Sequence, residues 1–395
     1  MFELRHDKYG THMKAYVKEE NSSIPINLTR SANVPAFRKT LLEWYDGAQR
    51  YLPWRVRKQE QKNAYHTWLS EIMLQQTTVQ AVKPYFLNFI QKWPEVTTLA
   101  KAQDDDVMAA WAGLGYYARA RNLLKCARII ANPPYNGEFP QDYAALASLP
   151  GIGPYTASAI SAIAFDQPSV VVDGNVERVM SRLFNIHKAY PDSKKEIYDK
   201  AAFLSKSYTD APGNYAQAMM DLGATICTPR KPKCYLCPVK KYCGGFYAGQ
   251  AEQLPKRKPK TKKPHRQGQM FWIENSQGEV LIEKRNSSRM LGNMSGLPGS
   301  NWDKPELNDE NIADILYKIT GLKFNSSEEP LASVKHSFTH FHLTLEIYSY
   351  KSEYPASYCY EYLPDKYRFI AKQNLLDIGL PSLYKKAAQL VFSNK

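Results

Sequence analysis

Two carboxylic acids in this chain have neighbours that could support acid–base chemistry. Glu71 lies in AYHTWLSEIMLQQ, a predicted helix over residues 64–76, with Trp68 and Leu74 three residues to either side. Apolar neighbours remove water from a carboxyl, which raises its pKa towards neutrality and suits a proton donor. Asp173 follows three branched apolar residues and precedes a Gly-containing turn, where a second carboxylate could act. The ordinary alternatives are an exposed helical Glu71 and an Asp173 that only caps a helix.

The residues between these two acids include a turn that could bind a phosphate group. Residues 149–153, LPGIG, are followed by Pro154 and by apolar residues at helical spacing, so a helix is predicted to begin at about Pro154. A short helix is predicted just before the turn. Gly151 and Gly153 allow positive φ and leave backbone N–H groups open beside a helix N-terminus, which together attract an anion. The pattern predicts a helix-hairpin-helix that grips a DNA phosphate, although a helix C-cap followed by a tight turn uses the same residues.

Four of the six cysteines lie close together in the sequence and could hold a metal centre. They are Cys227, Cys234, Cys237 and Cys243. Four thiolates in one short loop can bind either zinc or an iron–sulfur cluster. Their uneven spacing lacks the paired Cys-x2-Cys units of a zinc ribbon, which favours the cluster. The first interval also carries Arg230, Lys231 and Lys233, so a cluster would fix a basic loop for phosphate contact.

The charge of the whole chain indicates a polyanionic partner. Its 395 residues suffice for two domains, and Lys+Arg 52 against Asp+Glu 38 give a net charge of +14. A basic protein is drawn to nucleic acid because neutralised phosphates release counterions. The sequence has no apolar run of about eighteen residues and no secretory signal, so a membrane partner is not expected. We expect a soluble, intracellular, cytoplasmic protein that works on DNA.

Helices that would position these groups are predicted from Phe37 onward, after a polar extension over residues 1–35. Further helices are predicted over about residues 84–92, 104–111, 117–132 and 216–224.

Two uncharged or aromatic stretches among these helices could contact DNA bases. Gln76 belongs to the polar end of the helix that carries Glu71 and could reach base edges. Tyr116 lies in GLGYY, ahead of Arg119 and Arg121, and could enter a DNA stack as a wedge while the guanidinium groups contact phosphates. A core position for the aromatic residue is the alternative.

The C-terminal part changes from helical to mixed α and β patterns. A basic, proline-broken segment over residues 255–266 is the predicted interdomain linker. Residues 270–274 and 279–285 predict a β-hairpin, and residues 341–347 alternate as a half-buried strand. A helix is expected over residues 311–320.

Together these stretches resemble the adenine DNA glycosylases of the MutY type, in the helix-hairpin-helix superfamily that also contains endonuclease III. The matching motifs run in family order: LPWR at 52–55, WLSEIMLQQT at 68–77, GLGYYARARNL at 113–123, LPGIGPYTA at 149–157, VDGNVERV at 172–179, AQAMMDLGA at 216–224, and the four cysteines. The resemblance implies a multidomain fold, with an all-α helix-hairpin-helix glycosylase domain that carries a [4Fe-4S] cluster loop and a C-terminal α+β domain similar to Nudix hydrolases.

The resemblance also gives expected domain boundaries. They are an N-terminal extension over 1–35, the glycosylase domain over 36–248, a basic linker over 249–268 and the Nudix-like domain over 269–395. Within the glycosylase domain, a six-helix barrel is expected over about 64–170 and an iron–sulfur subdomain from 36–63 and 171–248.

By this resemblance the protein removes adenine mispaired with 8-oxoguanine or guanine in double-stranded DNA, acts in base excision repair and is a monomer. Glu71 matches the acid that protonates the flipped adenine, and Asp173 matches the carboxylate that stabilises the oxocarbenium-like sugar. Asn175 and Tyr155 match supporting groups beside these two acids. The residues expected to bind DNA or adenine are Arg55, Gln76, Tyr116, Gly151, Gly153, Gln217, Arg230, Lys231 and Lys233, and those expected to recognise 8-oxoguanine are Phe338, Thr339 and His340.

Tyr155 also distinguishes two branches of the superfamily. In the endonuclease III branch a lysine nucleophile at this position forms a Schiff base and cleaves the strand. Tyrosine here predicts a monofunctional enzyme that leaves an abasic site. Thr339 stands where the family often has serine, and residues 311–320 lack the acidic pairs of a Nudix box, so the C-terminal domain is expected to bind and not to hydrolyse. A bifunctional glycosylase/lyase and a non-catalytic DNA-binding protein stay open as alternatives.

Overall fold

The structure is a computed structural model that describes residues 24–55, 62–205, 207–259, 262–302, 317, 329–352 and 365–393. The chain divides into two compact units. The first contains Met1–Ala48, Gly174–Leu204 and Ala218–Arg257, and the second contains Gln49–Asp173, Ser205–Gln217 and Lys258–Lys395. Most of the extension expected over residues 1–35 lies outside the described residues. None of the helices in the described ranges is long and apolar enough to cross a lipid bilayer.

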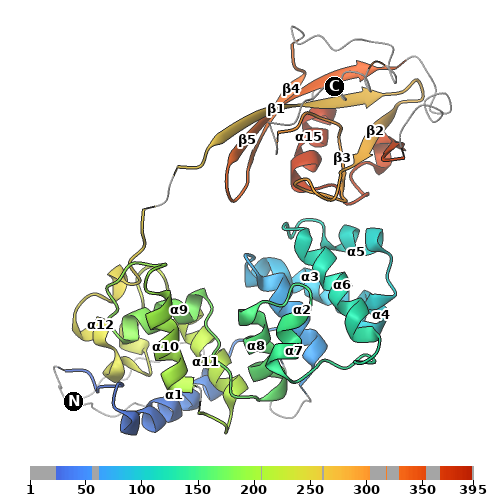
Figure 1. Cartoon of the computed structure of the whole chain (residues 1–395). Coiled ribbons are helices and arrows are strands. Elements are labelled where there is room, and N and C mark those ends of the chain that lie inside the picture. The colour runs from blue at the N-terminus through green and yellow to red at the C-terminus, as the bar shows by residue number, and fades with distance from the viewer. Residues whose placement is uncertain are drawn as a thin grey trace, which may run out of the picture. The chain divides into compact units, whose positions relative to one another are not determined.

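The helices of the second unit that precede its sheet pack around one hydrophobic core, and Figure 1 shows them grouped together. They are α2 (Ala64–Leu74), α3 (Val79–Lys92), α4 (Val96–Ala100), α5 (Asp104–Trp111), α6 (Ala118–Ala131), α7 (Tyr143–Ser148) and α8 (Pro154–Phe165). Helix α2 packs against α3, α6 and α8, and Trp68 on α2 is fully buried. A helix with neighbours on several sides is covered around most of its surface. The polar residues of α2 are therefore buried together with the apolar ones.

The first unit is also helical. Its elements are the 3-10 turn Ser31–Asn33, α1 (Val34–Ala48), α9 (Gly174–Leu183), α10 (Lys194–Ser205), α12 (Gly244–Tyr247) and the 3-10 turns Cys234–Leu236, Lys240–Tyr242 and Ala251–Gln253. Helix α11 (Pro212–Thr225) contains the point at which the chain passes from the second unit to the first. The apolar residues Val176, Val179 and Met180 face the buried side of α9, which directs that helix into the core.

The C-terminal part of the second unit is a mixed sheet with a helix. The strands are β1 (His265–Glu274), β2 (Glu279–Lys284), β3 (Ser295–Gly296), β4 (Ala332–Ser337), β5 (His342–Lys351) and β6 (Tyr367–Ala371). Their order is β3-β2-β1-β5-β4, with β6 paired to β2. Strands β1 and β5 are parallel and the other pairs are antiparallel. Helix α15 (Ser382–Ser393) lies beside this sheet (Figure 1). Its residues Leu383, Tyr384 and Val391 share one core with Trp272.

The predicted helices are present, with differences at their ends that have local causes. Helix α2 stops at Leu74, two residues early, because Gln75 leaves helical geometry and Gln76 has a φ of 56°. Helix α3 begins at Val79, before the expected start at residue 84, because the Thr78 side chain accepts a hydrogen bond from the backbone N–H of Ala81. A capping threonine thus outweighs a proline as the start signal.

The predicted C-terminal elements agree with the structure where it describes them. Strands β1 and β2 form the expected antiparallel hairpin, and the strand expected over 341–347 is β5. Strand β1 starts at His265, inside the stretch expected to be linker, because its first residues pair with β5 from His342 onward. Of the helix expected over 311–320, only Tyr317 is among the described residues.

Candidate active site

Glu71 lies inside the buried helix α2, where it is 7% exposed. Burial raises its pKa from 4.5 to about 7. A hydrogen bond from Tyr155 opposes this shift, the negative charge of Asp173 adds to it, and the charge of Arg55 opposes it. The expected desolvated carboxyl with a near-neutral pKa is confirmed, and the alternative of an exposed helical glutamate is wrong.

Tyr155 and Asp173 complete one group with Glu71 in the second unit. Burial holds the pKa of the Tyr155 hydroxyl well above its ordinary value, and the charges of Glu71 and Asp173 raise it further. The hydroxyl therefore keeps its proton and donates it in a hydrogen bond to the Glu71 carboxyl. Asp173 is half-buried and lies immediately before α9. Two carboxyls and a hydroxyl from three separate parts of the chain thus come together.

The helix-hairpin-helix forms as expected from α7, the turn over 149–153 and α8. Pro154 is the first residue of α8. Gly151 has a φ of 78°, and a Cβ there would lie 3.0 Å from the Cβ of Asn122, so both backbone conformation and space require glycine. The expectation for Gly153 is wrong in one respect: its φ is −85°, because an extended residue before the helix already opens the N-terminus. Only Gly151 needs the left-handed region.

Arg55 and Gln217 belong to the second unit but differ in their surroundings. The charge of Arg55 acts on Glu71, which places this guanidinium near the acid group. Gln217 is 9% exposed on α11. Its side-chain amide donates to the Gly213 carbonyl at 3.3 Å, which is its hydrogen bond among the described residues. The structure thus groups Arg55 with Glu71, whereas Gln217 is held within its own helix.

The expected wedge residue lies in an unusual backbone conformation. Tyr116 is 45% exposed and has a φ of 48°. The expectation that Arg119 contacts phosphates is wrong, because its guanidinium donates to backbone carbonyls that include Gln75 O at 2.6 Å and Leu114 O at 3.0 Å. Arg121 donates to the Gly292 carbonyl at 2.7 Å. The basic residues after the tyrosines therefore support the backbone.

A pocket of the second unit contains the residues expected to recognise 8-oxoguanine. It has a volume of about 470 Å³, and its lining includes Tyr116, Arg121, Met290, Phe338, Thr339 and His340. The hydroxyls of Tyr116 and Thr339 are hydrogen bonded to each other. Phe338 stacks on Trp302 with ring centroids 5.5 Å apart and planes 19° apart. The pocket therefore joins the expected wedge to the expected recognition loop.

In the first unit, the four clustered cysteines are not in disulfide bonds. Burial raises the pKa of Cys237 and of Cys243, and the other thiols of the group raise both values further. Among the described residues, no group of three or more His, Cys, Asp or Glu side chains is arranged to hold a metal ion. The charges of these thiols act on one another, so the four cysteines share one region of the first unit.

Two arginines on α9 connect to this cysteine region, and sequence reasoning missed both. Arg178 donates to the Cys227 carbonyl at 2.7 Å and to the Asn175 side chain at 2.8 Å. Arg182 is 1% exposed and donates to Cys227 Sγ at 3.3 Å and to Thr228 O at 2.7 Å. At helical spacing both arginines lie opposite the apolar residues Val176, Val179 and Met180 of α9, so the sequence pattern predicts an exposed basic face and gives no signal of their burial.

The three basic residues of the cysteine loop, Arg230, Lys231 and Lys233, are exposed as expected. Lys231 has a φ of 47°, and its backbone N–H donates to the Glu252 carboxylate at 3.0 Å. The loop backbone is thus held while its cationic side chains reach solvent.

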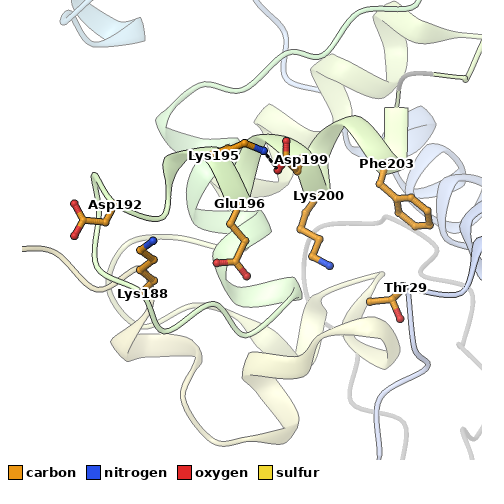
Figure 2. Close-up of a pocket in the computed structure, with 8 residues that line it drawn as sticks. All are labelled: Thr29, Lys188, Asp192, Lys195, Glu196, Asp199, Lys200 and Phe203. Atoms are coloured by element: carbon orange, nitrogen blue, oxygen red, sulfur yellow. Dashed lines mark hydrogen bonds and ion pairs between the residues drawn. The ribbon is translucent and has the colours of Figure 1, made fainter.

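A separate pocket of the first unit, of about 510 Å³, differs in charge from this loop. Its lining is Thr29, Lys188, Asp192, Lys195, Glu196, Asp199, Lys200 and Phe203 (Figure 2). Lys195 and Asp199 form an ion pair at 2.6 Å. Because its lysines are matched by equal numbers of acids, this pocket offers no net positive charge to a phosphate.

Comparisons with known proteins agree with both parts of this description. Residues 69–205 match the HhH-GPD superfamily of base excision DNA repair proteins, and residues 269–390 match the NUDIX domain. The adenine DNA glycosylase of Homo sapiens is 34% identical over 369 residues, which cover 80% of this chain and 67% of that protein. That of Buchnera aphidicola subsp. Schizaphis graminum is 34% identical over 311 residues, or 78% and 85% of the two chains.

A solved structure, that of a thermostable thymine-DNA glycosylase, is 28% identical with a TM-score of 0.48 and covers 55% of this chain and 98% of that chain. The matches to the adenine DNA glycosylases extend over most of both sequences. The helical and Nudix matches fall on the helices and on the mixed sheet described above. On these grounds the chain belongs to the adenine DNA glycosylase family, with a helix-hairpin-helix glycosylase domain followed by a Nudix-like domain.

Proposed function

We propose that this protein is a monofunctional adenine DNA glycosylase of base excision repair, which removes adenine opposite 8-oxoguanine or guanine in duplex DNA. The observation that carries the proposal is the group of Glu71, Tyr155 and Asp173, in which burial keeps one carboxyl partly protonated at neutral pH beside a second carboxyl. Membership of the family supplies adenine as the base.

The two carboxyls divide the reaction between them. Adenine is a poor leaving group as an anion, so the Glu71 proton passes to the base while the electron pair of the N-glycosidic bond moves onto it. Positive charge then develops on the sugar, and the Asp173 carboxylate stabilises this charge. Water adds to the sugar carbon and gives a proton to the Glu71 carboxylate, which restores the acid and leaves an abasic site. Before this step the adenine must leave the base stack, at a cost that is lower in a mispair.

Tyr155 supports the monofunctional outcome in two ways. Its hydroxyl is a hydrogen-bond donor to Glu71 and holds the acid in place. It carries no amine, so it cannot form the Schiff base that precedes strand cleavage by a lyase. Asn175, which accepts from Arg178, is a supporting group on the chain just after Asp173.

Recognition of the opposite base is assigned to the pocket around Phe338, Thr339 and His340. Its volume of about 470 Å³ suits a purine with aromatic stacking and hydroxyl or imidazole hydrogen bonds. We further propose that Gln76, Tyr116, Gly151 and the basic cysteine loop contact the DNA around the extruded adenine. The working unit is a monomer, since one chain supplies the whole acid group, and it acts inside the cell because its substrate is DNA.

Cys227, Cys234, Cys237 and Cys243 are assigned as ligands of a [4Fe-4S] cluster. The donor set fits, because these thiols share one region, and the buried Arg182 beside Cys227 needs negative charge that thiolate ligands would supply. When bound, the cluster would supply a structural link that fixes the loop carrying Arg230, Lys231 and Lys233.

The test is cleavage of an end-labelled duplex that carries one adenine opposite 8-oxoguanine, resolved on a denaturing gel with and without alkali. We expect strand breaks only after alkali, their loss in Glu71→Gln, and their retention in Glu43→Gln, a matched change at an exposed glutamate of α1. Duplexes with guanine, cytosine or thymine opposite adenine test the mispair requirement. A nick without alkali would establish a lyase, and binding without any abasic site would establish a non-catalytic DNA-binding protein.

A further inference from the structure

Several residues in the described ranges have a backbone conformation that L-amino acids rarely adopt. Apart from Gly, Asn and Asp, positive φ occurs in that part of the chain at Gln76, Tyr116, Lys231 and Leu291, with values of 56°, 48°, 47° and 60°. Such a residue is strained by about 1 kcal/mol or more and persists only where its surroundings hold it. Gln76 and Tyr116 are both expected to enter the DNA, and one side chain holds both.

That side chain is Arg119, at the start of α6. Its Nη1 donates to three carbonyls at the end of α2: Ile72 (2.9 Å) and Met73 (3.0 Å) in the last turn, and Gln75 (2.6 Å) just after it. The last carbonyls of a helix have no partner within the helix and carry partial negative charge. Arg119 therefore caps carbonyls at the end of α2 from its place on α6, immediately before Gln76.

The second terminal nitrogen of the same guanidinium, Nη2, holds the loop that carries Tyr116. Arg119 Nη2 donates to Leu114 O at 3.0 Å and to Gly115 O at 3.3 Å. It also donates to Thr77 Oγ1 at 3.3 Å, on the far side of Gln76. The guanidinium carbon lies 5.6 Å from the ring centroid of Tyr116. One planar cation is thus bonded on both sides of Gln76 and just before Tyr116.

Lysine could not replace these contacts. The hydrogen-bond partners of Arg119 among the described residues are carbonyl oxygens and one hydroxyl, and they lie in two groups around the two terminal nitrogens of its planar fork, whose four N–H bonds they share. An ammonium group has three donors around one point and is more strongly hydrated. The arrangement therefore requires arginine itself and not only a positive charge.

We propose that Arg119 is a positioning residue that holds Gln76 and Tyr116 as a preformed pair before DNA arrives. The inference rests on the proposed function only for its consequence in catalysis. Arg119 joins the two segments in the absence of DNA. A pair that is already ordered loses less conformational entropy when it enters the duplex, so binding to a mispair is tighter. Within the described residues the guanidinium is bonded to the end of α2 and to the loop before α6, so Arg119 acts on extrusion of the base and not on the chemical step.

The first test needs no substrate. Hydrogen exchange of the DNA-free protein should show that amides of residues 75–77 and 114–117 open together in the wild type, and that both segments exchange faster in Arg119→Lys. Arg128→Lys is the matched control, because Arg128 on the same helix donates to Ala100 O and Ala102 O at 3.3 and 3.1 Å. Independent opening of the two segments in the wild type, or unchanged exchange in Arg119→Lys, would overturn the inference.

The second test compares two substrates, an adenine in a mispaired duplex and an unopposed adenine in a bulge, which is already largely unstacked. In Arg119→Lys we expect KM for the mispair to rise about tenfold, or about 1.4 kcal/mol, with slower extrusion of 2-aminopurine. The single-turnover rate on the bulge at saturating enzyme should stay within about threefold of wild type, as it should for both substrates in Arg128→Lys. Equal losses on both substrates would instead assign Arg119 to chemistry or folding. If the wild type excised neither adenine, the proposed function would fail while the exchange result still decided the role of Arg119.

Discussion

Tyr155→Phe should move the alkaline limb of adenine excision to higher pH. Glu71 must hold a proton to donate it, and its pKa of about 7 leaves about half of the molecules protonated at pH 7. A glutamic acid with the ordinary value of 4.5 would be well under 1% protonated there, so the buried position raises the protonated fraction by roughly two orders of magnitude. The Tyr155 hydrogen bond stabilises the ionised form and holds the pKa down. Without this bond the pKa of Glu71 rises further, because burial and the charge of Asp173 still raise it.

The size of the shift follows from the strength of a hydrogen bond to a charged group. Such a bond contributes about 1.5–3 kcal/mol, and each pKa unit corresponds to about 1.4 kcal/mol. We therefore expect the limb to move up by about one to two pH units. The assay is single-turnover excision with enzyme in excess, from about pH 6 to 9.5, in which the wild-type rate falls tenfold per pH unit well above the pKa of Glu71. Tyr198→Phe, at a half-exposed tyrosine of α10, is the control.

The pH at which the rate begins to fall tests the pKa of Glu71. The plateau rate does not test it, because Tyr155 also orients the acid and its loss can lower the rate at every pH. A wild-type rate that stays constant between pH 6 and 9 would refute the assignment of Glu71 as the proton donor. A limb that moves to lower pH in Tyr155→Phe would refute the direction of the hydrogen bond. Tyr198→Phe should leave the profile where it is.

Other predictions concern stability and DNA affinity. Because Glu71 has a raised pKa, the native protein loses stability as pH rises from about 4.5 to 7, so Glu71→Gln should gain about 3 kcal/mol at pH 8 relative to its effect at pH 4.5. Urea unfolding at both values measures this gain, and equal effects at the two values would contradict it. Gly151→Val should destabilise the protein by roughly 1–3 kcal/mol, because of positive φ and the close Asn122 side chain; an unchanged thermal midpoint would argue against a rigid hairpin. Lys231→Gln with Lys233→Gln should lower the slope of log affinity against log salt by about one for each phosphate that the protein no longer neutralises, which binding titrations at several salt concentrations would show or rule out.

The elements around the acid could be predicted because each has a local signal. Pro154 marks the start of α8, and alternating apolar residues mark β5. The buried state of Glu71 could be predicted from Trp68 and Leu74 on the same helix. These signals depend on neighbours in the sequence, so a single chain contains them in full.

The arginine contacts that support the site could not be predicted in the same way. Arg119, Arg178 and Arg182 bind chiefly backbone carbonyls. A carbonyl is present at every residue, so the sequence contains no complementary side chain that would identify the partner. Sequence reasoning therefore assigned Arg119 to phosphate, by its charge alone, and did not single out the other two.

Three residues that break local rules in the second unit are among those that the proposed chemistry needs. A glutamate in the middle of an apolar helix and two L-residues at positive φ all oppose stability. Each is held by one specific neighbour, Glu71 by the Tyr155 hydroxyl and Gln76 with Tyr116 by the Arg119 guanidinium. Folding alone would favour a neutral residue at the first position and glycine at the other two. That the chain keeps the costly residues together with their holders is the physical argument that proton donation and DNA entry are built into the fold before substrate binds.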